Sequence, residues 1–182
     1  SRATISVGYI GLYEVATAFY GPDWETNSEA KLFTLNVLRA LSEYAKKLKA
    51  EHGYHFSVYG TPSESLTDRF ARLDLEKFGE IPDITDKGYY TNSFHYDVRK
   101  NPTPFEKIDF EADYPIYSGG GFIHYCEYPV LKHNPEALES VWDYAYDKVG
   151  YLGTNTPIDR CYECGFSGEF APTQDGFECP SC

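Results

Sequence analysis

The chain has 182 residues, 42% of them hydrophobic, with 17 Tyr and 12 Phe, which suits a folded domain with a core and excludes a disordered chain. Its formal net charge of -12 disfavours a general nucleic-acid-binding role, because an acidic surface repels phosphate. There is no long uncharged apolar run and no signal-peptide pattern, so we expect neither a membrane span nor a secretory leader.

Patterns typical of strands and of helices alternate over the first part of the chain. In order, they predict a strand at 3–7, a helix at 12–20, a helix from about Thr26 to Gly53, a strand at 54–59, a helix to about Gly79, a strand or ordered loop at 89–98, strands at 114–117 and 122–128, and a helix from Pro135 through Val149. Thr26 and Glu29 have the spacing of a capping box, and Asn134 suits the cap of the last helix. This alternation predicts an α/β fold.

The composition changes after Gly150, where helical periodicity gives way to Gly, Pro, Thr and Cys. We therefore divide the chain into a larger α/β part, residues 1–150, and a small appended module, residues 151–182. The module carries five acidic residues against one basic residue, so nucleic acid is not its expected partner. A structural role is the better interpretation.

Four of the five cysteines lie in this module as two Cys-x-x-Cys pairs with 14 residues between them: Cys161, Cys164, Cys179 and Cys182. Two such knuckles, joined by a hairpin, can bring four thiolates to one tetrahedral zinc ion. A module this small has almost no core, so the metal would supply much of its folding free energy, on the order of 10 kcal/mol. The spacing therefore predicts a structural Zn²⁺ site.

Two alternatives for these cysteines stay open. Iron binds the same thiolate set, and redox-active disulfides use the same Cys-x-x-Cys spacing, although no helix is predicted after either pair. An odd number of cysteines, most of them clustered, is not typical of a secreted disulfide scaffold. We therefore expect a reducing, cytoplasmic location.

The stretch GTPSESL, residues 60–66, joins a predicted strand to a predicted helix. Thr61 suits the N-cap and Glu64 has the spacing of its capping-box partner. Ser63 and Ser65 add hydroxyl groups beside free backbone amides, which is what a phosphate-binding helix terminus requires. An ordinary capping box without a ligand explains the same residues, so both interpretations remain.

Two further stretches combine residues that often carry chemistry. Three glycines, 119–121, allow close backbone approach or a simple turn, and the strand after them places His124 and Cys126 on one face. These two side chains have the types of a nucleophile pair, but core packing is the favoured interpretation. His95 lies in the polar stretch TNSFH, where a loop network is the default. The catalytic residues are therefore unknown, and the roles of these three residues stay unassigned.

The order of GTPSESL, YYTNSFHYDV, GGGFIHY and TPIDRCYECG, followed by the second Cys-x-x-Cys, resembles the C-terminal part of anaerobic (class III) ribonucleotide reductases. The resemblance covers essentially the whole chain, with the T-even bacteriophage branch as the nearest likeness. It implies part of a ten-stranded α/β barrel of the glycyl radical enzyme type, with a small C-terminal zinc-ribbon module.

The family reduces ribonucleoside triphosphates to deoxyribonucleotides. The resemblance implies that an iron–sulfur activase that uses S-adenosylmethionine installs a glycyl radical. This radical takes a hydrogen atom from a cysteine, and the resulting thiyl radical takes one from the 3′ carbon of the ribose. The resemblance also implies nucleotide effectors bound elsewhere and a homodimer. By their match to its motifs, the zinc ligands are Cys161, Cys164, Cys179 and Cys182, and the residues at the substrate phosphates are Thr61, Ser63, Glu64 and Ser65.

Two family features have no match here. The radical glycine follows the last zinc cysteine in the family and the thiyl cysteine lies upstream, so we expect this chain to be a segment that is inactive alone. Cys126 is not assigned the thiyl role. The alternative function is a non-catalytic α/β domain whose zinc ribbon docks a protein partner; an enzyme of the pyruvate formate-lyase kind is disfavoured, because that family lacks the ribbon.

Overall fold

The structure, a computed structural model, describes residues 3–60, 63–129, 131, 133–156, 158–168, 170–173 and 176–182. Its helices and strands, with three short 3-10 helices labelled η, are β1 (Thr4–Gly8), α1 (Leu12–Tyr20), η1 (Trp24–Thr26), α2 (Ser28–His52), β2 (His55–Tyr59), α3 (Glu64–Phe78), η2 (Val98–Lys100), α4 (Pro104–Glu111), η3 (Pro115–Tyr117), β3 (His124–Glu127), α5 (Pro135–Tyr146), β4 (Leu152–Asn155), β5 (Asp159–Arg160), β6 (Ser167–Gly168), β7 (Ala171–Thr173) and β8 (Gly176–Glu178). Within these described ranges, none of the helices is both long and apolar enough to cross a lipid bilayer.

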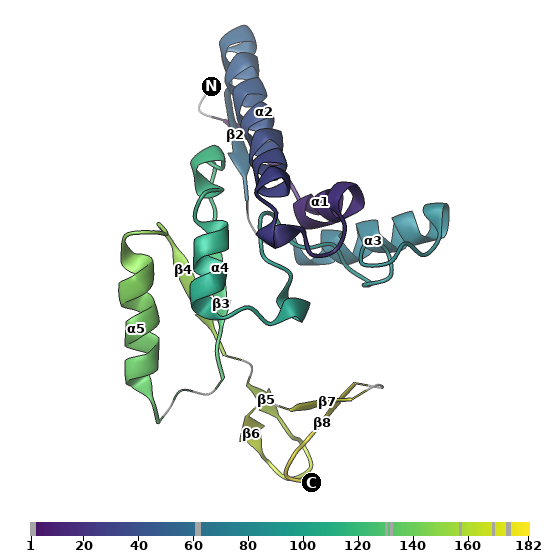
Figure 1. The fold of residues 1–182 in the computed structure, drawn as a ribbon, viewed down its shortest axis with the longest axis vertical. Coiled ribbons are helices and arrows are strands. Elements are labelled where there is room, and N and C mark those ends of the chain that lie inside the picture. Colours follow the sequence, from purple (N-terminus) through teal and green to yellow (C-terminus); the bar gives the residue numbers. More distant parts are fainter. Residues whose placement is uncertain are drawn as a thin grey trace.

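Two pairs of parallel strands form the centre of the α/β part. β1 pairs with β2 and β3 pairs with β4, each over its full length. Parallel neighbours need a crossover connection, and α2 and α5 lie in these two connections. The predicted α/β fold is thus confirmed, and Figure 1 shows the small strands β5 to β8 gathered at the C-terminal end of the molecule.

The glycine run joins the two strand pairs. The amide of Gly60, directly after β2, donates to the carbonyl of Gly121 at 2.9 Å, and the amide of Gly120 donates to the carbonyl of Val58 at 2.7 Å. A Cβ atom on Gly120 would lie 2.7 Å from Oγ of Ser57 and 2.8 Å from the Val58 carbonyl oxygen, so no side chain fits there. Of the two interpretations of this run, close backbone approach is the one the structure confirms.

Two clusters of buried apolar residues form the core of the described structure. The first contains the buried residues Leu12, Tyr13, Ala16, Trp24, Ala30, Leu38, Phe94, Phe110 and Tyr114. The second lies among α4, β3 and α5 and contains Ile108, Cys126, Tyr128, Val141 and Ala145. Cys126 is only 1% exposed, and burial raises the pKa of its thiol, which is consistent with a packing role.

Most predicted elements are confirmed, but the cap of α2 is not. The cap is Asn27, whose side chain accepts hydrogen bonds from the amides of Glu29 and Ala30 at 2.9 and 3.3 Å, whereas Thr26 ends η1. Asparagine satisfies the free amides at the helix start as well as threonine does, so the helix begins one residue later than the Thr26 spacing suggested. The C-terminal end at Gly53 is confirmed, with a left-handed φ of 69°.

The predicted strand at 114–117 is wrong. Residues 115–117 form η3, and Tyr114 is fully buried, with its hydroxyl 2.8 Å from Oγ1 of Thr34. Burial of this ring against α2 holds the chain in a turn, and Pro115 fits the first position of η3. Residues 89–97 form an ordered loop in which Asn92 makes an isolated bridge with Ile10, and Val98 begins η2.

The boundary at residue 150 between the two predicted parts stays a prediction. β4 begins after residue 150, yet it pairs with β3. The antiparallel pairs begin only with β5, which pairs with β6, and β7 pairs with β8. The strand pairing favours a boundary between Asn155 and Asp159 over one at residue 150.

Candidate functional site

The four C-terminal cysteines come together in space. The Sγ atoms of Cys161 and Cys182 are 3.5 Å apart, those of Cys164 and Cys179 are 3.6 Å apart, and all four lie within 4.8 Å of one another. Four sulfurs at about 2.3 Å from one tetrahedral ion lie about 3.8 Å from each other. The sulfur separations therefore fit one shared metal ion, and they are far longer than a disulfide bond of about 2.0 Å.

The backbone of each cysteine pair is shaped as a knuckle. In the first pair, the Cys161 amide donates to the carbonyl of Phe166 at 2.8 Å, and the amide of Gly165 donates back to the Cys161 carbonyl at 3.0 Å. Gly165 has a φ of 75°, which a residue with a Cβ atom rarely adopts. In the second pair, the amide of Ser181 donates to Sγ of Cys179 at 3.4 Å. In the described part of the chain, the element after the first pair is the strand β6 and not a helix, which favours the metal interpretation over a redox pair.

Backbone amides also favour the thiolate form that binds metal. The amides of Cys164 and Glu163 lower the pKa of the Cys161 thiol to about 6. The hydrogen bond with Cys161 raises the pKa of the Cys182 thiol to about 12, because a thiol beside a thiolate releases its proton less readily. An all-sulfur donor set is one that zinc prefers, and the group fits a metal ion such as zinc.

The start of α3 differs from the prediction. The N-cap is Ser63, two residues after the predicted Thr61, and the helix begins at Glu64. The Ser63 amide donates to Oδ1 of Asn92 at 2.8 Å, which fixes the chain just before the helix. Thr61 and the Glu64 side chain lie outside the described part of the structure, and Ser65 is exposed.

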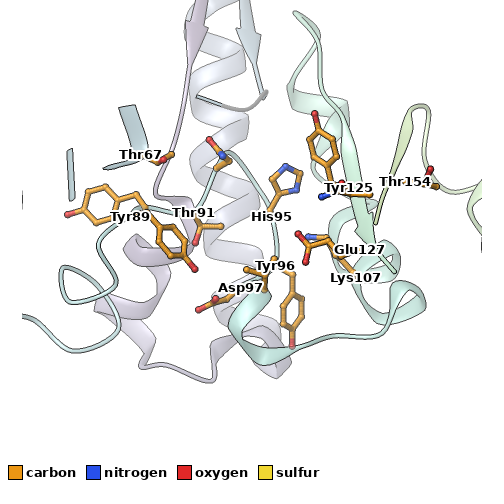
Figure 2. Close-up of a pocket in the computed structure, with 14 residues that line it drawn as sticks. Thr67, Tyr89, Thr91, His95, Tyr96, Asp97, Lys107, Tyr125, Glu127 and Thr154 are labelled. Atoms are coloured by element: carbon orange, nitrogen blue, oxygen red, sulfur yellow. The ribbon is translucent and has the colours of Figure 1, made fainter. Parts of the chain in front are cut away.

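A cavity of about 420 Å³ lies at the carboxyl ends of β3 and β4, beside the 89–98 loop (Figure 2). Ligands of parallel α/β sheets usually bind at this edge. The wall combines flat aromatic rings with polar groups, and it includes Tyr89, Tyr90, Tyr96, Tyr125, Asn92, His95, Lys107, Glu127 and Asn155. Of the stretches that the sequence singled out, the cavity brings together TNSFH and the strand after the glycine run.

Glu111, the last residue of α4, lies at the centre of a buried polar cluster. Its Oε1 accepts from the Tyr96 amide at 2.9 Å and from Nζ of Lys107 at 2.7 Å. Nδ1 of His95 lies 3.2 Å from the same oxygen, and Nδ1 of His124 lies 3.0 Å from Oε2. Burial alone raises the pKa of Glu111, but the Lys107 charge and the two imidazoles outweigh it and hold this pKa well below its usual range.

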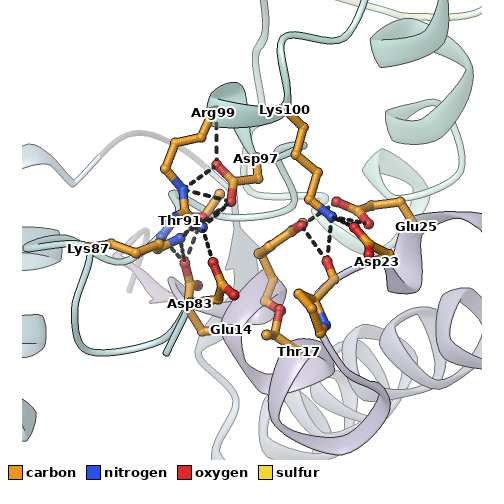
Figure 3. Close-up of polar contacts among 12 residues, drawn as sticks. Glu14, Thr17, Asp23, Glu25, Asp83, Lys87, Thr91, Asp97, Arg99 and Lys100 are labelled. Carbon is orange, nitrogen blue, oxygen red and sulfur yellow. Dashed lines mark hydrogen bonds and ion pairs between the residues drawn. The ribbon is translucent and has the colours of Figure 1, made fainter. Parts of the chain in front are cut away.

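A second buried network holds the cavity loop against α1 (Figure 3). Glu14 accepts from the amide and hydroxyl of Thr91 at 2.9 and 2.7 Å and pairs with Lys87, whose side chain is fully buried. Asp97 accepts from Nη2 of Arg99 at 2.7 Å. Burial raises the pKa of Asp97, but Arg99 and Lys87 outweigh it, and the net pKa is lowered.

The sequence reasoning missed Glu111, Glu14, Lys87 and Asp97. Glu111 and Glu14 lie on different segments from most of their partners, and isolated charged residues in helices and loops follow no periodic pattern. The helix that carries Glu111 was itself missed, although Thr103 and Glu106 form a complete capping box at its start. That capping box was the signal that would have located it.

Comparison with known proteins identifies the type of protein. The crystal structure of the anaerobic ribonucleotide reductase from Thermotoga maritima with MES in the active site superposes with a TM-score of 0.71 at 26% identity, covering 96% of this chain and 29% of that chain. The fold is thus that of an anaerobic ribonucleotide reductase segment. The sequence model of the family described as anaerobic ribonucleoside-triphosphate reductase matches residues 1–182, so the chain belongs to that family.

Two relatives with the same description, anaerobic ribonucleoside-triphosphate reductase, match this whole chain. The protein of Haemophilus influenzae is 56% identical over 182 residues, which make up 26% of its length. The protein of Enterobacteria phage T4 is 43% identical over 181 residues, or 28% of its length. The chain therefore spans about a quarter of these relatives. The bacterial relative is the more similar of the two, although the motifs had suggested the phage branch.

Proposed function

We propose that the whole protein reduces ribonucleoside triphosphates to 2′-deoxyribonucleoside triphosphates under anaerobic conditions, as an oxidoreductase that uses glycyl and thiyl radicals. The family match over residues 1–182 carries this proposal. It favours the reductase over a non-catalytic domain that docks a protein partner. The radical glycine and the thiyl cysteine are expected outside residues 1–182, and this segment alone is not expected to be active.

The finer architecture is part of the same proposal. The parallel strands β1 to β4 would form part of a ten-stranded α/β barrel, and the strands from β5 onward would form the zinc-ribbon module. Two observations support this. Both strand pairs are parallel with helical crossovers. Ile5 and Val7 on β1 are 45% and 36% exposed, so other segments of the whole protein could pack against them.

Zn²⁺ is the metal proposed for the four cysteines, Cys161, Cys164, Cys179 and Cys182. Bound there, zinc would act as a structural cross-link that fixes the two knuckles to each other. The sulfur separations and the knuckle backbones support this assignment. The module would then support the loop that carries the radical in the whole protein.

The corner after β2 is proposed to receive the substrate phosphates through Thr61, Ser63, Glu64 and Ser65. The first amides of a helix have no partner within the helix and attract anions. Glu64 would contribute its backbone amide, because its carboxylate repels phosphate. The position of the corner at the carboxyl end of β2 supports a ligand site.

The proposed partners are an S-adenosylmethionine-dependent iron–sulfur activase, nucleotide effectors bound elsewhere in the whole protein, and a second copy in a homodimer. Nucleic acid is not a proposed partner, because the net charge is -12. Full-length protein, incubated anaerobically with its activase, S-adenosylmethionine and a reductant, should convert ribonucleoside triphosphates to deoxyribonucleotides. Absence of product from protein that shows a glycyl radical signal by electron paramagnetic resonance would contradict the proposal.

A further inference from the structure

We propose that Nε2 of His95 accepts a hydrogen bond from a sugar hydroxyl of a nucleotide bound in the cavity, and that Glu111 is the positioning residue that holds His95 in the required tautomer. The identity of the ligand rests on the proposed function. The geometry of the histidine is independent of it.

The tautomer follows from the contacts of Glu111. An ionised carboxylate can only accept hydrogen bonds, so the Nδ1 atoms of His95 and His124, at 3.2 and 3.0 Å from its oxygens, must donate. A neutral imidazole with its proton on Nδ1 carries a lone pair on Nε2. In the neutral form of each ring, Glu111 therefore leaves Nε2 as an acceptor.

Neither acceptor has a protein partner in the described part of the chain. Nε2 of His95 and Nε2 of His124 are both buried and unpaired there. Buried polar atoms are nearly always hydrogen-bonded in folded proteins, so a missing partner points to a ligand or to another group of the whole protein. The position of each ring distinguishes the two histidines.

His95, and not His124, borders the cavity (Figure 2). The His124 side chain is 1% exposed, and its ring packs near Phe94 and Phe122 with centroids 5.1 and 6.1 Å away. The His95 side chain is 10% exposed, with its ring centroid 5.9 Å from that of Tyr125 on β3. His95 is therefore the histidine that a ligand in the cavity can reach.

The charge of the cavity wall favours a neutral hydroxyl over an anion. Asp97 and Glu127 line the cavity, and the Lys107 ammonium is already paired with Glu111 at 2.7 Å. A phosphate at this wall would meet carboxylates, whereas a sugar would meet aromatic faces and acceptors. The cavity volume of about 420 Å³ is within the usual range for small-molecule sites, about 300–1,000 Å³.

The cavity also adjoins the proposed phosphate corner. Asn92 lines the cavity, and its Oδ1 accepts from the amide of Ser63 at the start of α3. A nucleotide with its phosphates at α3 would thus have its uncharged part on the cavity side of Asn92. This arrangement separates the anionic and hydroxylated ends of one ligand.

The test compares nucleotide binding to full-length variants by equilibrium dialysis, using a ribonucleoside triphosphate and its 2′,3′-dideoxy analogue. His95→Asn keeps a donor toward Glu111 but lacks Nε2, and His95→Gln can return an oxygen acceptor to that position. The wild type should prefer the ribonucleotide by about 5-fold at this site, the Asn variant should lose that preference, and the Gln variant should regain part of it. His95 lines this cavity, so a change in nucleotide preference between wild type and the His95 variants reports on the cavity and not on other nucleotide sites.

Two outcomes overturn the inference while leaving the proposed function intact. One is an unchanged preference in His95→Asn, and the other is equal weakening of both nucleotides, which would mean that His95 acts without a contact to the sugar hydroxyls. Failure of the wild type to bind any ribonucleoside triphosphate would instead overturn the proposed function as well.

A second measurement does not depend on ligand binding. In ¹⁵N NMR spectra of histidine-labelled protein, the His95 signals are assigned by their loss in His95→Asn. The wild type should show the Nδ1–H tautomer of His95, and these signals should shift in Glu111→Gln. An Nε2–H tautomer in the wild type would refute the assignment.

Discussion

Oδ1 of Asn92 accepts a hydrogen bond of 2.8 Å from the backbone amide of Ser63. These residues are 29 positions apart, and the contact connects the cavity loop to the first turn of α3. The proposed phosphate corner and the proposed sugar cavity therefore share one structural element. A change at Asn92 should affect both.

Replacement of Asn92 by alanine should leave the Ser63 amide without this acceptor. We expect a loss of about 1 kcal/mol of unfolding free energy and a several-fold weaker affinity for ribonucleoside triphosphates. Chemical denaturation and equilibrium dialysis of the full-length protein measure the two effects. Asn36→Ala, in the middle of α2, is the matched control and should lower neither quantity; equal effects of both substitutions would contradict the role of Asn92.

Replacement of Ser63 and Ser65 together by alanine tests the phosphate corner. The double variant should bind ribonucleoside triphosphates about 10-fold more weakly, because two hydroxyl donors to an anion are lost. The affinity for the corresponding nucleoside should change little. If triphosphate affinity stays the same as in wild type, the phosphate assignment is wrong.

Metal analysis tests the cysteine group. Purified protein should contain about one equivalent of zinc per chain, and Cys161→Ser should lower that content and the melting temperature of the C-terminal module. Cys126→Ser is the control, since this cysteine lies in the apolar core, and it should keep its zinc. Less than half an equivalent in carefully prepared wild type would count against a four-thiolate site.

Glu111→Gln should destabilise the protein at neutral pH by about 3 kcal/mol, because Lys107 would lose its buried partner. The folded-state pKa of Glu111 lies below its unfolded value, so its contribution is present above the unfolded pKa and is lost as pH falls toward the folded pKa. The stability difference between wild type and variant should therefore shrink below about pH 4. His95, His124 and Lys107 also face this carboxylate. Glu139→Gln, on the exposed face of α5, should show no such pH dependence.

Gly120→Ala should destabilise the junction between β2 and β3 by about 1–3 kcal/mol, because the new Cβ atom would overlap Ser57 and the Val58 carbonyl. Gly119→Ala is a matched control in the same run, since a Cβ atom there meets nothing within 4 Å. Thermal denaturation of the two variants compares them directly. Similar melting temperatures would contradict the close approach.

Local patterns allowed most of the fold to be predicted. α1 has the predicted bounds, and Gly53 and Gly79 follow the last residues of α2 and α3, because helical periodicity and terminal glycines are local signals. The cysteine spacing likewise predicted a group of four sulfurs that the structure brings together. In each case, the information lies within a short stretch of sequence.

The cavity could not be predicted in the same way. Glu111 contacts His95 and His124, which are 16 and 13 residues away on opposite sides of it in the chain, and these contacts exist only after β3 and the loop have packed. The turn at 115–117 was misjudged for a related reason, since Tyr114 is fixed by the distant Thr34. Tertiary packing, rather than local propensity, decides such positions.

The junction between the two strand pairs is formed by hydrogen bonds between the peptide groups of Gly60 and Gly121 and between those of Gly120 and Val58. The distance between the corner after β2 and the cavity at the end of β3 is consequently set by main-chain geometry. A side-chain substitution at Ser63 or Asn92 would therefore not remove any of these main-chain hydrogen bonds directly.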